Sequence, residues 1–366
     1  MLNNKTVAVV VPCYNESKQI KMVLDSMPSY VDRIIVVDDA SKDDTAGTVM
    51  KLITDNSSTL KLTSVLKNEI THNIYNRADI EVRQKSIDEI QKFIPSEIIN
   101  TNPEEERIIV IKHLENGGVG AAIATGYKWC KDHDIDCTAV MAGDGQMDPN
   151  ELESICAPVV NEGIDYVKGN RLIHKSAWVI IPRVRFLGNS ILSILTKIAS
   201  GYWGVSDTQS GYTAISNNAL NSVPLYDIYK RYGMPNDLLV KLNIAFCTIR
   251  EVKIKPIYGV GEKSKLNIIK VSIPILLLLI RSFFTRLQTK YLYRSFHPLY
   301  LLYWSAFIIG AINTYFLYQL IVNFFDPNTK TPTDYLIIFI FLTISGFQSL
   351  LFAMWMDIQD NERLSK

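Results

Sequence analysis

The stretch AVMAGDGQMDP, residues 139–149, joins an apolar run to acidic and amide side chains on a glycine-rich backbone. We expect residues 137–143 (CTAVMAG) to form a buried strand, because the run is short, apolar and closed by turn residues. Asp144, Gln146 and Asp148 follow it directly. Their oxygens suit a hard cation held against a phosphorylated ligand. A plain surface turn is the alternative interpretation, since Gly, Asp and Pro are ordinary turn residues.

The first 265 residues repeat this pattern of an apolar run, a polar turn and a helix. Apolar runs at 6–12, 32–41, 106–113, 137–143 and 164–171 predict strands, and helical spacing predicts helices at 15–27, 43–53, 121–133 and 150–163. This alternation predicts a doubly wound, largely parallel α/β sheet. Ligands bind such sheets outside the carboxyl ends of the strands. We therefore expect one crevice lined by the polar residues at those ends: Asn15, Glu16, Asp38, Asp39, Asn116, Asp144, Asn170 and Arg171.

Residues 54–105 interrupt the alternation with a long polar segment. Val82, Ile87, Ile90 and Ile94 form a helical apolar stripe within it. The segment is either an inserted subdomain or a partly disordered surface excursion.

Composition excludes some classes of function. The net charge is +1 and charged residues make up 20% of the chain, so no global positive field indicates nucleic-acid binding. The apolar run at the N-terminus is too short for a signal peptide, which predicts a cytoplasmic N-terminal part. The five cysteines lack metal-ligand spacing and are expected to be reduced core thiols.

The last hundred residues carry membrane signals. Residues 298–325 and 335–356 are uncharged and long enough to span a bilayer, so 298–356 reads as a two-helix transmembrane hairpin. Residues 267–294 contain Arg281, Arg286 and Lys290 and suit an amphipathic juxtamembrane helix among the headgroups. The positive charge there predicts that the catalytic part and the C-terminus are cytoplasmic.

Residues 176–203 form another strongly apolar segment, with Arg183 and Arg185 in its first half. A core helix is one interpretation. We favour an interfacial helix, because two buried arginines would each need a partner.

Seven short motifs, taken in order, resemble one family. They are PCYNE (12–16), VVDDASKDDT (36–45), NGGVGAAIATGY (116–127), GDGQMDP (143–149), KGNR (168–171), DTQSGYTAIS (207–216) and FHPLYLLY (296–303). The chain resembles family 2 glycosyltransferases of the GT-A fold, in the polyprenyl-phosphate group that includes dolichol-phosphate mannose synthase. It departs from the family's D-x-D-x-Q motif at the first position, which is Ala142.

The resemblance implies a metal-dependent enzyme at the cytoplasmic face of a membrane. It would transfer a hexose with inversion from UDP-Glc, UDP-GlcNAc or GDP-Man to undecaprenyl or dolichyl phosphate, using Mg2+ or Mn2+. Asp144 and Gln146 match the metal motif, and Asp144, Arg171 and Asp237 are the catalytic candidates. The expected donor-binding residues are Pro12, Tyr14, Asn15, Glu16, Asp38, Asp39, Asn116, Gly120 and Lys265, the last in a loop at 258–267. The expected acceptor-phosphate ligands are Arg171, Arg183 and Arg185, since arginine suits bidentate phosphate contact.

The sequence leaves three other functions open as alternatives. A processive polysaccharide synthase would need more spans and a Q-x-x-R-W motif. An inactive, membrane-tethered scaffold is favoured only by Ala142. A glycosyltransferase acting on a glycolipid hydroxyl would use a carboxylate such as Asp237 as a base. The expected partners are a nucleotide sugar, a polyprenyl phosphate and the membrane, with homo-oligomers left open.

Overall fold

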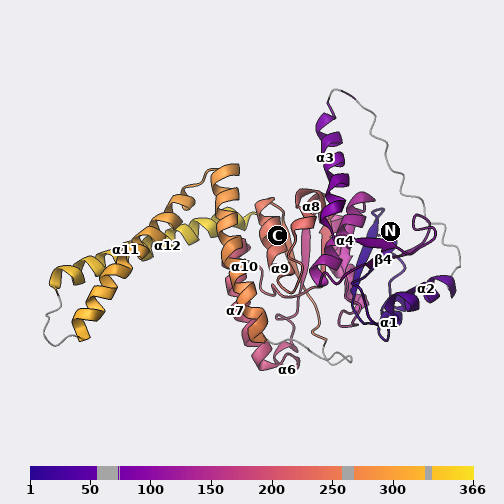
Figure 1. Ribbon diagram of the computed structural model, residues 1–366, viewed down its shortest axis with the longest axis horizontal. Coiled ribbons are helices and arrows are strands. Elements are labelled where there is room, and N and C mark those ends of the chain that lie inside the picture. The colour runs from indigo at the N-terminus through magenta and orange to yellow at the C-terminus, as the bar shows by residue number, and fades with distance from the viewer. Residues whose placement is uncertain (56–72, 74, 258–267, 326–331) are drawn as a thin grey trace.

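An eight-stranded mixed sheet forms the centre of the protein (Figure 1). The computed structural model describes residues 1–55, 73, 75–257, 268–325 and 332–366. The strand order is β3-β4-β2-β1-β5-β7-β6-β8. The strands are β1 (Val7–Cys13), β2 (Arg33–Asp38), β3 (Ser96–Ile98), β4 (Ile108–His113), β5 (Cys137–Val140), β6 (Tyr166–Asn170), β7 (Thr213–Ser216) and β8 (Ile249–Lys253).

The predicted parallel core of the sheet is confirmed. Strands β4, β2, β1 and β5 are parallel neighbours, and Cys13 at the end of β1 lies beside Asp38 at the end of β2. Strand β7 runs antiparallel to both β5 and β6, so β6 points the same way as β5. Strand β8 pairs parallel with β6, so the carboxyl ends of six strands meet at one edge of the sheet.

Helices cover both faces, as a doubly wound sheet requires. They are α1 (Ile20–Asp25), α2 (Thr45–Asp55), α4 (Val119–Asp132), α5 (Leu152–Glu162) after the short η2 (Pro149–Glu151), α8 (Asn217–Ser222), η3 (Leu225–Asp227) and α9 (Met234–Ile244). One buried cluster joins the sheet to α4 and α9 through Tyr127 and Leu238. A second joins its other face to α1 and α5 through Ile20 and Leu152.

The inserted segment is partly structured. It contributes α3 (Arg77–Asp88), η1 (Glu89–Lys92) and the edge strand β3, while residues 56–72 and 74 lie outside the described part. Helix α3 projects away from the sheet (Figure 1). The predicted apolar stripe is largely exposed, at 55% for Val82 and 54% for Ile87, and only Ile94 is buried. The stripe therefore does not make a subdomain core.

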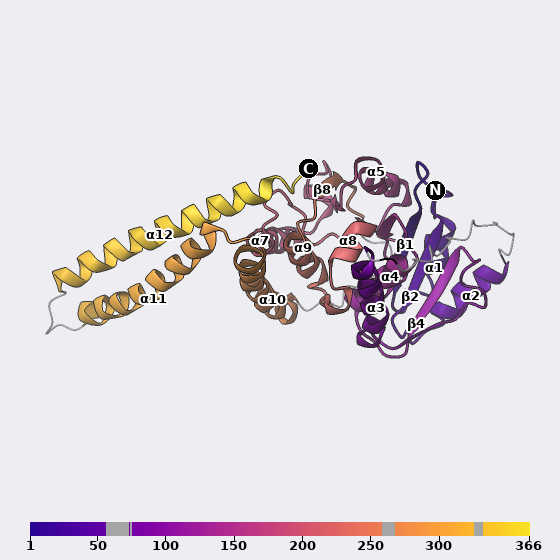
Figure 2. The same cartoon turned by 90° about the horizontal axis from the view of Figure 1, so that it is seen from above.

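The C-terminal part of the chain, from Pro298 on, extends as a long helical hairpin (Figure 2). It consists of α11 (Pro298–Phe325) and α12 (Thr333–Glu362), two helices long and apolar enough to cross a membrane, with only 6% of each apolar window buried. Helix α10 (Ile268–Gln288) and the π-helical turn η4 (Thr289–Arg294) precede them. Helix α10 runs across the direction of the hairpin (Figures 1 and 2). The C-terminus returns to the end of the hairpin at which the sheet lies.

Two local predictions were wrong. The first helix begins at Ile20 rather than at Asn15, because Asn15 has a left-handed φ of 59° and its side chain accepts from Lys42. Residues 176–203 form two helices, α6 (Ala177–Ile180) and α7 (Arg183–Ser200), since Pro182 between them fixes an extended break.

The charges of 267–294 also differ from expectation. Arg286 and Lys290 do not face headgroups, because both side chains are fully buried. Their partners are described below.

Candidate active site at the carboxyl edge of the sheet

Acidic side chains from three strand ends gather around Cys13. Burial, and then the charges of Asp38, Glu16 and Asp144, raise the pKa of the Cys13 thiol. Burial, followed by the carboxylates of Asp144 and Asp43, raises the pKa of Glu16 to about 7. The predicted convergence of Glu16, Asp38 and Asp144 is thus present.

The segment after β5 is a tight turn built around Asp144. Its Oδ1 accepts the amide of Gln146 at 3.0 Å, and Gly145 between them has a φ of 76°, which favours glycine. Gly143 lies so close to β1 that a Cβ there would meet Cys13 Sγ at 2.7 Å. The turn therefore holds Asp144 beside the end of β1.

The loop after β1 is joined to the loop after β2. Asn15 donates its amide to Ser41 Oγ at 2.9 Å, and Ser17 donates its amide to Asp43 Oδ2 at 3.1 Å. Pro12 is buried beneath this loop, while Tyr14 is 41% exposed beside it. These hydrogen bonds connect the two loops, so the predicted donor-binding residues of both loops lie close to one another.

Asp39 is bound internally. Its carboxylate accepts from His113 Nδ1 at 2.8 Å and from the amides of Gly117 and Gly118 at 2.8 and 2.7 Å. Burial alone would raise its pKa, but these hydrogen bonds outweigh burial and hold the pKa of Asp39 below its usual value. Asp39 thus caps α4, and a direct contact of its carboxylate with a donor stays a prediction.

Asn116 and Gly120 also contact protein groups. Asn116 Nδ2 donates to the Asp39 carbonyl at 3.0 Å, and the Gly120 amide donates to the Lys230 carbonyl at 2.9 Å. A Cβ on Gly120 would lie 2.1 Å from the Tyr229 carbonyl oxygen. The structure therefore gives Gly120 a close-packing role beneath residues 229–230.

Arg171 belongs to a cluster with two acids. Its Nε and Nη2 donate to Asp207 at 2.8 and 3.1 Å, and buried Lys168 donates to the Ser210 carbonyl. Glu251 accepts the amides of Ser206 and Asp207 at 2.8 and 2.9 Å. Burial, outweighing the nearby acids, lowers the pKa of Lys168 to about 8. Asp207 and Glu251 therefore offset the positive charges of Arg171 and Lys168, and a contact of Arg171 with a ligand stays a prediction.

The remaining candidates are dispersed. Asp237, in the first turn of α9, accepts from the Tyr229 amide at 2.9 Å and from Lys241 Nζ at 2.7 Å. Arg183 is exposed at the start of α7. The Arg185 side chain and the whole of Lys265 lie outside the described part of the structure.

Sequence reasoning gave no role to Asp43, His113, Asp207 or Glu251. Asp43 and Asp207 lie inside quoted motifs, so a search for carboxylates near strand ends would have found them. Glu251 lies within a strand that we did not predict, and only the fold brings it to Asp207.

The residues near Asp144 fit a divalent cation that is shared with a phosphorylated ligand. Among the described residues, no three His, Cys, Asp or Glu side chains converge to form a metal site by themselves. Mg2+ is commonly held by one or two carboxylates plus substrate phosphates and water. Asp144, with Gln146 and Glu16 nearby, supplies that type of incomplete oxygen set.

The comparisons define the class of protein. The sequence model described as glycosyl transferase family 2 matches residues 8–69 and 83–223, which cover the strands β1 to β7. The chain belongs to this family and is a glycosyltransferase.

Two curated relatives match most of their own length. The UDP-N-acetylglucosamine–dolichyl-phosphate N-acetylglucosaminyltransferase of Methanococcus voltae is 30% identical over 257 residues, which is 70% of this chain and 87% of that protein. An uncharacterized protein of Methanocaldococcus jannaschii is 27% identical over 259 residues, which is 70% of this chain and 84% of that protein.

The chain is also similar to solved structures of glucosyl-3-phosphoglycerate synthase from Mycobacterium tuberculosis. One of these, crystallised with Mn2+, UDP and phosphoglyceric acid, has 18% identity and a TM-score of 0.48, covering 77% of this chain and 78% of that one.

Proposed function

We propose that this protein transfers N-acetylglucosamine from UDP-N-acetylglucosamine to a polyprenyl phosphate at a membrane surface. The observation that carries the proposal is the 30% identity to the Methanococcus voltae enzyme, whose name gives that donor and dolichyl phosphate as the acceptor. Two structural features also support this proposal. They are the hairpin of α11 and α12, which is long and apolar enough to cross a membrane, and the acidic crevice around Glu16.

The donor half of the reaction uses the crevice. Asp144, Gln146 and Glu16 would hold Mg2+ or Mn2+, which when bound supplies positive charge to the departing diphosphate. The hydrogen bond within the turn at 144–146 orients the Asp144 carboxylate before the ligand arrives, and electrostatic catalysis requires such preorganisation. Asp38, at the buried end of β2, suits the ribose hydroxyls of the donor.

The acceptor half uses the helices beside the membrane. Leu187, Ile191 and Ile194 of α7 are exposed on one side of that helix, as are Ile273 and Leu277 of α10. Such amphipathic helices lie in the headgroup region when a neighbouring hairpin spans the bilayer. An apolar cavity of about 340 Å³ among α7, α10, α11 and α12, lined partly by Phe283, Tyr303 and Phe307, suits an isoprenoid chain.

The chemistry is a single displacement. A phosphate monoester is mostly dianionic at neutral pH and needs no strong general base. Arg171, oriented by Asp207, would donate to that phosphate. The other two candidates for this half of the site, Asp237 and Arg183, lie on the helices α9 and α7. Attack opposite the diphosphate inverts the anomeric carbon, so an α-linked donor gives a β-linked product. The catalytic domain and the C-terminus would face the cytoplasm.

The test is transfer of label to lipid. Purified protein is given labelled UDP-GlcNAc, UDP-Glc or GDP-Man with a polyprenyl phosphate, and the organic phase is counted with and without EDTA. We expect metal-dependent label from UDP-GlcNAc, with a β-anomeric proton by NMR. Label from GDP-Man alone would refute UDP-GlcNAc as the donor. An α-linked product would refute single displacement. Binding of the donor without transfer would favour an inactive scaffold.

A further inference from the structure

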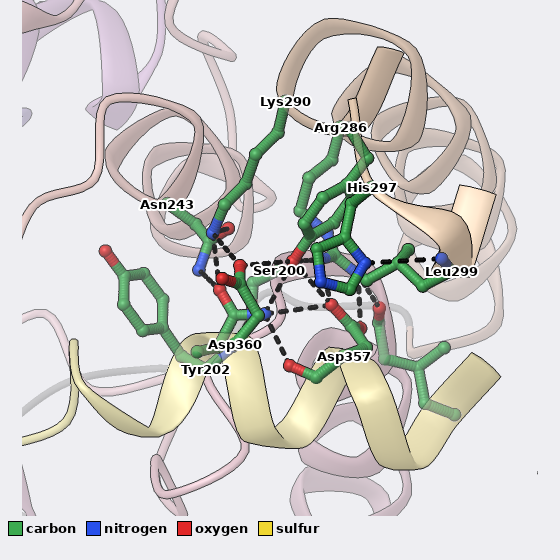
Figure 3. Close-up of polar contacts among 12 residues, drawn as sticks. Ser200, Tyr202, Asn243, Arg286, Lys290, His297, Leu299, Asp357 and Asp360 are labelled. Carbon is green, nitrogen blue, oxygen red and sulfur yellow. Dashed lines mark hydrogen bonds and ion pairs between the residues drawn. The ribbon is translucent and has the colours of Figure 1, made fainter. Parts of the chain in front are cut away.

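A buried polar cluster joins the second membrane helix to the rest of the protein (Figure 3). Arg286 of α10 makes a two-point ion pair with Asp357 of α12, at 2.7 and 2.8 Å, and both side chains are 0% exposed. One turn further on, Lys290 contacts Asp360 and Asn361 of α12. The cluster therefore connects two segments about seventy residues apart in the sequence, at the end of α12 nearest the sheet.

Every donor of the two cations is occupied. Arg286 also donates through Nε to the Ala199 carbonyl at 2.9 Å and through Nη2 to the Ile198 carbonyl at 3.0 Å, at the end of α7. Its fifth N–H, on Nη1, points to the Tyr291 hydroxyl at 3.5 Å. Lys290 also donates to Asn243 of α9 at 3.0 Å. Neither cation therefore has a donor left for a lipid phosphate.

The end of α7 is shaped around the guanidinium. Gly201 terminates α7 with a φ of 78°, and a Cβ there would lie 2.6 Å from Arg286 Nη1. A cation at a helix C-terminus also interacts favourably with the helix dipole. Arg286 thus holds together α7, α10 and α12, while Lys290 adds α9.

The chain end makes a second attachment just beyond the cluster. Ile249 of the edge strand β8 donates its amide to the Leu364 carbonyl at 2.7 Å, and Lys366 donates its amide to the Ile249 carbonyl at 2.9 Å. The Leu364 side chain is 5% exposed and belongs to the sheet's hydrophobic core. The second membrane helix is thereby fastened to the catalytic sheet itself.

A buried ion pair is weak evidence for stability, since its desolvation offsets much of its attraction, and specificity of arrangement is its better-attested use. We propose that residues 286, 290, 357, 360, 361 and 364 form a positioning latch. The latch holds the sheet and α7 at a fixed height over the membrane, so that the crevice meets an acceptor phosphate that emerges from the bilayer. Its catalytic effect rests on the proposed function, whereas its geometric effect does not.

The first experiment compares acceptors in the full-length protein. Arg286→Met should lower transfer to a long-chain polyprenyl phosphate in bilayers at least tenfold. Transfer to a short-chain polyprenyl phosphate dispersed in detergent, and the Kd for the nucleotide sugar, should stay within twofold. The double variant Arg286→Met with Asp357→Leu restores apolar packing and should recover at least half of the bilayer activity. Equal loss on both acceptors, or no recovery in the double variant, would overturn the latch.

The second experiment measures height without catalysis. All five cysteines are buried, so a dye on Glu105→Cys can be attached selectively. In Arg286→Met and in Leu364→Asp, the efficiency of energy transfer from that dye to labelled lipid in nanodiscs should decrease, or its distribution should become broader. It should stay unchanged in Arg77→Met, a control that removes an arginine from the exposed pair with Glu81. Unchanged transfer in both latch variants would refute the latch even if the enzyme proves to use another substrate.

Discussion

At the scale of single residues, the crevice combines two kinds of carboxylate. Asp39 has its charge satisfied by His113 and two backbone amides. Glu16 and Asp144 lie together and disfavour each other's charge. Asp39 is thus held by groups of the protein itself, whereas the ligand-binding role of Glu16 and Asp144 stays a prediction.

Asp144→Asn should reduce transfer about a hundredfold or more, because it removes the carboxylate best placed to hold the cation. The turn itself should survive, since an asparagine oxygen can still accept the Gln146 amide. Steady-state kinetics, with circular dichroism as a folding check, measure this. Asp148→Asn is the matched control, because Asp148 caps η2 in the same segment and should lose far less activity. An Asp144→Asn enzyme within a few-fold of the parent contradicts the metal role.

Asp39→Asn should destabilise the fold by about 1.5–3 kcal/mol at neutral pH, the range for hydrogen bonds to charged groups. The folded-state pKa of Asp39 lies below its unfolded value. Its stabilising effect is therefore complete above about pH 4 and is lost as the pH falls through the folded pKa. Urea titrations at several pH values should show the difference between parent and variant shrinking in acid.

The control for that series is Asp134→Asn, an exposed position with a left-handed φ of 51° that asparagine also tolerates. It should change stability by less than about 0.5 kcal/mol at every pH. A constant difference between Asp39→Asn and the parent down to strongly acidic pH would show that the charge is irrelevant.

At the scale of elements, the sequence predicts those strands and helices that have a clear pattern of apolar residues. Strands β1 and β2 are buried apolar runs, and they pair in parallel as predicted. Three of the five residues of strand β8 are charged, and β3 is exposed, so neither has a strong apolar signal. The break at Pro182 was predictable from proline chemistry, although the apolar content of 176–203 concealed it.

Two glycines in helices should respond oppositely to alanine. Gly120→Ala in α4 should destabilise by at least about 2 kcal/mol, because its Cβ would overlap the Tyr229 carbonyl and a packed backbone cannot yield cheaply. Gly188→Ala in α7 has nothing within 4 Å and should stabilise by about 0.5–1 kcal/mol through helix propensity. Thermal melts of both variants measure the difference. A Gly120→Ala protein that melts at or above the parent's temperature would show that residues 229–230 move freely.

At the scale of the whole molecule, composition separated the soluble and membrane parts but not their connection. Arg286 and Lys290 look like headgroup-facing charges in the sequence, since their acidic partners lie about seventy residues later. Contacts at that separation have no local signature. The same holds for Leu364, a residue of an exposed-looking tail that enters the sheet's core.

The last prediction compares two ways of removing the membrane hairpin. Deleting 298–366 takes away Asp357, Asp360 and Leu364, which leaves two cations without their partners and opens the core at β8. Breaking one buried pair costs about 3–5 kcal/mol, so this protein should aggregate or melt well below the parent. Replacing only 309–347 by a short Gly-Ser linker keeps those partners, and Gly346 already lies against Ile309, so the linker can close. The shortened protein should melt near the parent, bind nucleotide sugar normally and fail to sediment with liposomes. Melting curves of the parent and both variants in the same detergent, together with liposome sedimentation, measure the outcome. Equal stability of the two proteins would mean that the end of α12 contributes nothing to the catalytic part.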